Sequence, residues 1–306
     1  MKKVLVTGAD GFIGRYTLPV LIRVGFEVHA LCWHQQPDQQ DGIFWHHIDL
    51  MQKQDVNNLL ADIQATHLLH LAWYTAHGKF WHASENIEWV TASLGLLKGF
   101  AKYGGKRVVM AGSCAEYDWD EGHCSEQTTA INPSTLYGKS KYELCEQSSA
   151  FCADNAVSFA WGRVFFLYGP GESPARFVPA VINGLLNGES VPCSDGHQLR
   201  DFMHVSDVAS AFVSLLNSEL EGSVNIASGE AYTLKQIGER LMTHVDGEGQ
   251  IDFGALANRP DDPNVITADV TRLQQELNWL PSYSLDSGLA DTVAWWKRQQ
   301  ERVYAG

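Results

Sequence analysis

Residues 4–15 read VLVTGADGFIGR, and this stretch decides how the first half of the chain folds. Its apolar start predicts a buried strand, and the apolar residues that follow recur with the period of a helix. Gly8, Gly11 and Gly14 occupy the turn between the two. Gly8 permits a tight turn, Gly11 lets the backbone approach a pyrophosphate, and Gly14 allows close packing of helix on strand. Because the first N–H groups of a helix bind phosphate, the stretch predicts a dinucleotide site.

The alternation of strand and helix continues through the first half of the chain. Apolar runs predict strands at residues 4–7, 28–32, 44–48, 67–71, 107–111 and 157–165. Amphipathic stretches predict helices at residues 12–23, 55–63, 84–103 and 135–155. This order predicts an α/β fold with a doubly wound parallel sheet of the Rossmann type, in which ligands bind at the carboxyl ends of the strands.

The pattern changes after residue 165, where helical periods dominate and strand-like pieces are short. We therefore expect a dinucleotide-binding Rossmann domain over residues 1–165, to which a segment near residues 200–228 returns. Residues 166–306 are expected to form a smaller, mostly helical substrate-binding domain.

The composition argues against several classes of protein. Lys and Arg number 22 and Asp and Glu number 36, so the formal charge is −14, which disfavours binding to nucleic acid or to an anionic membrane. No apolar run reaches the ~20 residues of a membrane helix, and the start MKKVLVTGAD does not have the pattern of a signal peptide. The six cysteines show no paired CxxC spacing. We expect a cytoplasmic protein with reduced thiols.

No metal site is predicted. His67 and His70 lie three residues apart on a predicted strand, so their side chains face opposite sides of the sheet. No other group of potential ligands has a suitable type and spacing.

A serine, a tyrosine and a lysine carry the predicted chemistry. Tyr137 and Lys141 are four residues apart in STLYGKSKYE and share one face of a predicted helix. A nearby ammonium and a nicotinamide cation would lower the pKa of the phenol, which could then exchange a proton with a carbinol oxygen. Ser113, at the end of the fifth strand, would hydrogen-bond the same oxygen.

With these residues in place, the sequence resembles the extended short-chain dehydrogenase/reductase family, whose members modify nucleotide sugars. The signatures that carry the resemblance are TGADGFIG at Thr7–Gly14, Ser113 four residues before Tyr117, YGKSK at Tyr137–Lys141 and RDFMHVSDVA at Arg200–Ala209. Arg259 and the later segment ADVTRLQQELNWLPSYSLDSGL also match the family's C-terminal region. The resemblance covers nearly the whole chain.

The resemblance implies a set of site residues. Ser113, Tyr137 and Lys141 would be the catalytic triad. Besides Tyr137 and Lys141, the cofactor would be lined by Gly8, Gly11, Phe12, Ile13, Gly14, Asp49, Leu50, Leu71, Ala72 and Phe165. The substrate would be bound by Tyr74, Thr75, Cys114, Arg200 and Arg259. The two arginines would grip the nucleoside diphosphate, or else form structural ion pairs with acids such as Asp262.

The choice between NAD and NADP stays open in the sequence. The region after the second strand reads LCWHQQ, which offers neither an acid for the ribose hydroxyls nor an arginine for a 2′-phosphate. Arg15 and His34 are candidates near this end. Asp49 would bind the adenine amino group, or it caps a turn.

Departures from the family narrow the reaction. Sugar 4,6-dehydratases place Asp–Glu where this chain has Cys114 and Ala115, which argues against dehydration. The fucose-synthase type uses a cysteine and a histidine where this chain has Ala115 and Arg176, which argues against its kind of epimerisation. Phe166 replaces an asparagine that often touches the diphosphate. The loop HLAWYTAHGKFW also suggests an unusual substrate.

What remains is hydride transfer at one carbon. We expect an NAD(P)-dependent reductase of a nucleotide-linked 4-keto-6-deoxy sugar, with Tyr137 as general acid. A 4-epimerase with tightly bound NAD is the close alternative. A small-carbonyl reductase and a non-catalytic dinucleotide sensor are less favoured, because the chain keeps both arginines and the whole triad. The resemblance also implies a homodimer, formed through the helices predicted at residues 84–103 and 135–155.

Overall fold

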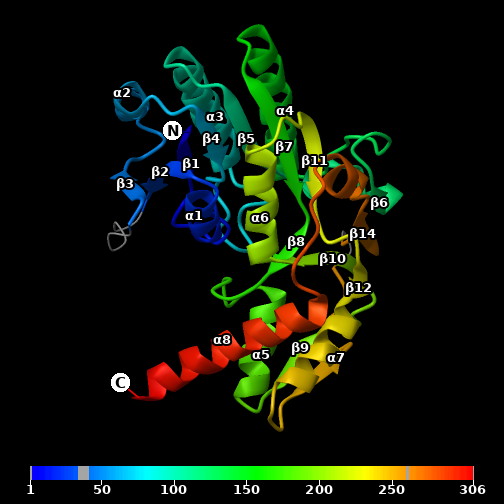
Figure 1. Ribbon diagram of the computed structural model, residues 1–306. Coiled ribbons are helices and arrows are strands. Elements are labelled where there is room, and N and C mark those ends of the chain that lie inside the picture. Colours follow the sequence, from blue (N-terminus) through cyan, green and yellow to red (C-terminus); the bar gives the residue numbers. More distant parts are fainter. Residues whose placement is uncertain (1, 34–40, 260–261, 306) are drawn as a thin grey trace.

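The computed structural model describes residues 2–33, 41–259 and 262–305, and its largest element is a seven-stranded parallel sheet (Figure 1). The strand order is β11-β7-β5-β4-β1-β2-β3. Its strands are β1 (Lys2–Thr7), β2 (Phe26–Cys32), β3 (Ile43–His47), β4 (His67–His70), β5 (Arg107–Ser113), β7 (Ser158–Val164) and β11 (Gly222–Ile226). The direction of winding reverses between β1 and β4, and such sheets bind ligands at this point.

Helices cover both faces of the large sheet. On one face lie α1 (Gly14–Arg23) and α6 (Val205–Leu216), which contact each other in front of the strands in Figure 1. On the other face lie α2 (Lys53–Ile63), α3 (Glu85–Lys102) and α4 (Leu136–Asp154).

The sequence of β1 shows why this sheet is buried on both sides. Val4 and Val6 belong to the apolar core under α1 and α6. Leu5, between them, belongs to the core under α2, α3 and α4. All three side chains are fully buried. A strand that is apolar on both faces suits the centre of a parallel sheet.

A second group of strands and helices lies beyond the carboxyl ends of the large sheet (Figure 1). Its strands are β6 (His123–Cys124), β8 (Phe166–Tyr168), β9 (Ser190–Cys193), β10 (Leu199–His204), β12 (Ala231–Thr233), β13 (Gln250–Phe253) and β14 (Val265–Ala268). β10 pairs with β8, β12 and β14, while β9 pairs with β13. The helices α5 (Phe177–Leu186), α7 (Leu234–His244) and α8 (Leu285–Ala305) share a third core.

Short helical segments complete the chain: η1 (Cys114–Glu116), η2 (Trp119–Glu121) and η3 (Arg272–Glu276). Within the described ranges, no helix has the length and apolar character that crossing a membrane requires.

The predicted α/β fold with a doubly wound parallel sheet is confirmed. β11 joins the large sheet from beyond residue 165 by pairing with β7. β6 leaves the first half of the chain and pairs with β14 in the smaller sheet. The division into two domains at residue 165 stays a prediction.

Candidate active site

The glycine turn between β1 and α1 is too tight for side chains at two of its positions. Gly8 has φ +65°, and a Cβ there would lie 2.8 Å from the Ala72 nitrogen. A Cβ at Gly14 would overlap the Gly8 carbonyl oxygen. The Gly11 N–H donates to this same oxygen at 3.0 Å. The turn therefore brings the start of α1 close to the ends of β1 and β4.

The start of α1 has no side-chain cap among the described residues. Ile13 is the N-cap residue, and Phe12 before it packs edge-on against Tyr16, with ring centroids 6.4 Å apart. An uncapped helix start presents N–H groups and the positive end of the helix dipole, which together bind phosphate. The residues present therefore fit the pyrophosphate of a dinucleotide.

Four more residues predicted to line the cofactor lie at the ends of β3 and β4. The Leu71 N–H donates to the Thr7 carbonyl oxygen at 3.2 Å, and the Ala72 N–H donates to Thr7 Oγ1 at 3.3 Å. Asp49 accepts a hydrogen bond from the backbone N–H two residues later at 2.8 Å, so one of its oxygens caps a turn. Leu50 is buried in the core with α2 and α3.

Trp33 directly follows β2, and its backbone N–H donates to the Asp10 carboxylate at 3.1 Å. The Trp33 side chain is 58% exposed. Arg15, a candidate for a 2′-phosphate, instead donates to the Gly171 carbonyl oxygen at 2.5 Å. His34 lies outside the described residues.

Ser113 ends β5 and caps η1. Its Oγ accepts a hydrogen bond from the Ala115 N–H at 3.2 Å, and its own N–H donates to the Glu116 carboxylate at 2.7 Å. This reciprocal pair is a capping box. It fixes both the backbone and the side chain of Ser113 at the carboxyl edge of the large sheet.

Tyr137 lies in the first turn of α4. Thr135 caps this helix by accepting a backbone hydrogen bond at 3.1 Å, and the Tyr137 N–H donates to the Trp81 carbonyl oxygen at 3.0 Å. Three aromatic rings meet the phenol ring edge-on. Their centroids lie 4.9 Å (Phe80), 5.7 Å (Trp81) and 6.5 Å (Trp73) from its own.

Lys141 lies one turn further along α4 and is buried. Its Nζ donates to the Ala111 carbonyl oxygen at 2.8 Å and lies 3.8 Å from the centroid of the Trp73 ring. Nζ lies 6.0 Å from the centroid of the Tyr137 ring. Burial lowers the pKa of Lys141 to about 7, and the negative charge of Glu116 opposes this change.

The protonation of Tyr137 differs from the expectation. Burial raises the pKa of the phenol, and hydrogen bonding with Ser113 opposes the rise. We expected Lys141 to lower the pKa of this phenol, but the effect of burial dominates, because apolar rings enclose the phenol ring. Tyr137 is therefore a protonated phenol beside Ser113 in this structure.

Arg200, predicted to bind the diphosphate, forms a structural ion pair. It is 2% exposed, and its Nη2 donates to the Asp262 carboxylate and to the Pro263 carbonyl oxygen, both at 2.7 Å. Its Nη1 donates to two further carbonyl oxygens, including that of Leu199 at 2.9 Å. Phe166, at the position where the family often has asparagine, lies 5.3 Å below the guanidinium.

Arg259 and Arg176 lie near His77, in the loop that follows β4. Burial lowers the pKa of His77, and the positive charges of both arginines act in the same direction. Arg176 also lies 5.6 Å over the ring of Phe80, which packs on Tyr137. Among the described residues, neither arginine forms an ion pair.

Glu172, which sequence reasoning missed, does not cancel the charge of Arg176. Its side chain is 9% exposed, and one carboxyl oxygen has no hydrogen-bond partner in the described part of the chain. Burial raises the pKa of Glu172 to about 8, although Arg176 opposes the rise. Glu172 is therefore mainly neutral at pH 7.

The remaining predicted residues lie around this centre. Tyr74 is half-buried and Thr75 is exposed, in the loop that follows β4. Cys114 and Phe165 are buried in the core that contains Tyr117. Burial raises the pKa of the Cys114 thiol, so this side chain is a neutral thiol rather than an acid–base group.

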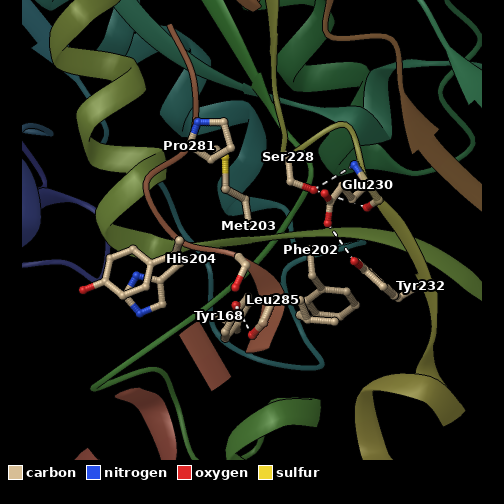
Figure 2. Close-up of a pocket in the computed structure, with 11 residues that line it drawn as sticks. Tyr168, Phe202, Met203, His204, Ser228, Glu230, Tyr232, Pro281 and Leu285 are labelled. Carbon is tan, nitrogen blue, oxygen red and sulfur yellow. Dashed lines mark hydrogen bonds between the residues drawn. The ribbon is translucent and has the colours of Figure 1, made fainter. Parts of the chain in front are cut away.

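A small pocket lies between β8, β10 and the segment before α8 (Figure 2). The His204 ring packs against Tyr283 at a tilt, with centroids 4.1 Å apart. The Tyr168 hydroxyl donates to the Leu285 carbonyl oxygen at 3.3 Å. The lining residues, all described, include none that was predicted for catalysis, cofactor or substrate. This pocket is therefore not the candidate active site.

Sequence reasoning named Tyr74 and Thr75 in the loop after β4 but missed its three rings around Tyr137. The signal was present, since Trp73, Phe80 and Trp81 make this loop unusually rich in large apolar residues. Sequence reasoning also missed the contact between Ser113 and Glu116, although residues 113–116 read SCAE, which has the S-x-x-E spacing of a capping box.

Known proteins resemble this chain in sequence and fold. Residues 4–227 match the family model described as the NAD dependent epimerase/dehydratase family. The chain is 26% identical to the UDP-glucose 4-epimerase of Bacillus subtilis, covering 95% of this chain and 96% of that protein. It is 24% identical to UDP-glucuronic acid decarboxylase 1 of Xenopus tropicalis, covering 98% of this chain and 73% of that protein. A structure of the UDP-N-acetylglucosamine 4-epimerase from Methanobrevibacter ruminantium, in complex with UDP-N-acetylmuramic acid, matches with a TM-score of 0.87 and 25% identity, covering 97% of this chain and 99% of that one.

Proposed function

Because the chain belongs to the NAD-dependent epimerase/dehydratase family, we propose that this enzyme is a 4-epimerase of a nucleotide-activated sugar. Its cofactor is NAD, as the family implies, and the glycine turn and uncapped start of α1 fit a dinucleotide. The observation that carries the proposal is the meeting of Ser113, Tyr137 and Lys141 beside this turn. The two relatives named as 4-epimerases favour this reaction.

In this proposal Tyr137 exchanges one proton with the sugar hydroxyl at the reacting carbon. NAD would supply reversible hydride transfer at that carbon. Tyr137 would first lose its proton to solvent, driven by the positive charge of the nicotinamide. The resulting phenolate takes the hydroxyl proton as the carbinol becomes a ketone, and the phenol later gives the proton back. Protonated Lys141 stabilises the phenolate, and Ser113 hydrogen-bonds the same sugar oxygen.

The nucleoside diphosphate is proposed to bind at Arg176 and Arg259. The positive charges of both guanidinium groups lower the pKa of His77, and neither group has an ion-pair partner among the described residues. Guanidinium groups grip phosphate oxygens in a two-pronged manner. The relatives named above act on or bind UDP-linked sugars by their names, so UDP-sugars are the first compounds to test.

A reductase of a nucleotide-linked 4-keto-6-deoxy sugar is the second candidate. The observation in its favour is that burial raises the pKa of Tyr137. A protonated phenol is the form that donates a proton to a ketone oxygen.

Two incubations separate the two candidates. The protein is loaded with NAD and given UDP-glucose or UDP-galactose, and the anomeric signals are followed by proton NMR. A 4-epimerase interconverts the two sugars without net consumption of cofactor. A reductase leaves them unchanged. In a second incubation, which contains NADH and a nucleotide-linked 4-keto-6-deoxy sugar, it oxidises one NADH for each sugar reduced. Binding of NAD with neither reaction, across sugars linked to UDP, dTDP, CDP and GDP, would refute both candidates.

Two variants test the role of Tyr137. Tyr137→Phe removes the hydroxyl and should lower kcat by at least about 1,000-fold while NAD still binds, because proton transfer is lost. Tyr142→Phe is the matched control, since Tyr142 lies on the same helix and is half-buried. Full activity in Tyr137→Phe would refute the proposed role.

A further inference from the structure

Glu116 is a completely buried carboxylate directly behind Ser113. Its Oε1 accepts hydrogen bonds from the Ser113 N–H at 2.7 Å and from Trp161 Nε1 at 3.0 Å. Its Oε2 accepts hydrogen bonds from Arg163 Nε at 2.7 Å and from Trp161 Nε1 at 3.0 Å. Arg163 in turn donates to the Tyr117 hydroxyl at 3.0 Å. Every oxygen of this carboxylate is therefore held by donors from β5 and β7.

Three successive residues of β5 link this carboxylate to two of the predicted catalytic side chains. The Ala111 carbonyl oxygen accepts the hydrogen bond of Lys141 at 2.8 Å. Gly112 leaves room for Glu116, because a Cβ there would lie 2.7 Å from its Oε1. The Ser113 N–H donates to this same oxygen. Glu116 thus packs against the backbone that anchors both Ser113 and Lys141.

We propose that Glu116 is a positioning residue, whose carboxylate holds residues 111–113 so that Ser113 and Lys141 keep their places beside Tyr137. The proposal rests on the function proposed above and deepens it. Glu116 acts through the backbone of β5, because a completely buried side chain touches neither substrate nor cofactor.

The charge of Glu116 also acts on Lys141. Burial lowers the pKa of Lys141 to about 7, and Glu116 opposes that change. Without Glu116 the ammonium would therefore be lost at a lower pH. The other titratable or charged groups near the pair come from β4, η1, α4 and β7 and are His70, Cys114, Tyr117, Tyr137, Cys145 and Arg163.

An amide cannot replace this carboxylate. Arg163 Nε and Trp161 Nε1 both donate toward residue 116, and the NH2 group of glutamine would face at least one of these donors. Glu116→Gln therefore keeps the shape of the side chain but loses its charge and part of its hydrogen bonding.

Two readouts of Glu116→Gln do not depend on any substrate. NMR of 13C-labelled lysine follows the titration of Lys141, whose signal is identified by its absence in Lys141→Met. The midpoint should fall by about one pH unit or more. Amide hydrogen exchange at Ser113 should become at least about tenfold faster, because the N–H loses a charged acceptor. If both readouts match the parent protein, the proposal is overturned.

Turnover gives the third readout, with the NAD-loaded protein and UDP-glucose as the probe. In Glu116→Gln we expect kcat to fall roughly 100-fold through misplacement of Ser113 and Lys141, with little change in KM. The alkaline limb of the kcat profile should move to lower pH. If the parent protein turns over no UDP-sugar, the proposed function fails, but the lysine titration and the amide exchange still decide the role of Glu116.

Glu126 provides the matched control. Its carboxylate also accepts a hydrogen bond from a backbone N–H, that of Asn225 at 2.7 Å, but this bond does not involve residues 111–113. Glu126→Gln should leave the Lys141 titration, the Ser113 exchange and kcat unchanged. Equal changes in both variants would overturn the specific role of Glu116.

A double variant separates positioning from stability. Glu116→Gln alone leaves Arg163 buried without a counter-charge, which costs stability. Glu116→Gln with Arg163→Met removes both charges from the core. In this folded double variant kcat should stay low. Recovery of the parent kcat would show that Glu116 serves stability alone.

Discussion

The guanidinium of Arg200 and the carboxylate of Asp262 form an ion pair with an N–O distance of 2.7 Å. The same guanidinium donates to backbone carbonyl oxygens of Leu199, Pro263 and Asn264. These bonds engage both terminal nitrogens, the groups that a diphosphate would need. Arg200 therefore holds the backbone at residues 262–264, whereas Arg176 and Arg259 form no ion pair with any described residue.

Asp262→Ala should lower the free energy of unfolding by about 2 kcal/mol, because a buried guanidinium loses its charged acceptor. Urea denaturation measures this. Asp286→Ala is the matched control, since Asp286 also forms a 2.7 Å pair, with Arg240, but both side chains are exposed. The control should cost less than about 0.5 kcal/mol. Equal costs would contradict the structural role of Arg200.

Arg176→Gln and Arg259→Gln should each weaken the binding of UDP about tenfold, because each removes a charged donor that forms no ion pair with any described residue. Isothermal titration of the NAD-loaded protein with UDP measures the affinities. Arg298→Gln controls for the loss of one positive charge, since Arg298 is exposed on α8. Unchanged affinity in both site variants would place the diphosphate elsewhere.

Gly14→Ala should abolish detectable NAD binding and lower the Tm, because the new methyl group would overlap the Gly8 carbonyl oxygen. Gly95→Ala is the matched control. Gly95 lies in α3 with nothing within 4 Å of its added Cβ, so this change should be neutral or slightly stabilising. Thermal denaturation with and without NAD reports both effects, and normal NAD binding by Gly14→Ala would contradict the steric argument.

Acidification should destabilise the protein through His70. Its ring lies between Thr7 Oγ1 at 2.7 Å and Ser93 Oγ at 2.8 Å, and burial lowers its pKa to about 3. Because the unfolded chain binds this proton below about pH 6.5, stability is lost as the pH falls from there toward 3.

Between pH 7.5 and pH 5 this loss should be about 2 kcal/mol. His70→Gln has no proton to bind at this position, so its stability should fall less over the same range. Denaturant titrations at both pH values measure the difference. Parallel pH dependence in the two proteins would show that His70 does not contribute.

Features set by neighbours in the chain could be predicted from the sequence. The glycine turn and the four-residue spacing of Tyr137 and Lys141 depend only on local backbone geometry. The helix predicted at residues 135–155 is α4, from Leu136 to Asp154, with Thr135 as its N-cap. The sequence of such a helix contains both the spacing of its buried residues and its N-cap residue.

Features set by distant partners could not be predicted. β14 pairs with β6 through Thr267 and His123, and strands this short show no alternation of their own. Likewise, the sequence shows Glu116 only as a polar residue after a strand. Its ion pair with Arg163 on β7 becomes visible only in the folded structure. The partner of a buried charge is chosen by the tertiary fold.

The chain crosses between the two sheets several times. It leaves the large sheet at Ser113, visits the small sheet at β6 and rejoins the large sheet's helices near Tyr137; it then crosses again after β7 and after β11. A molecule stitched in this way has no single linker about which one half could swing. Ser113, at the end of β5, and Tyr137, in the first turn of α4, therefore both belong to the large sheet and its helices, so their spacing does not depend on how the smaller sheet is placed.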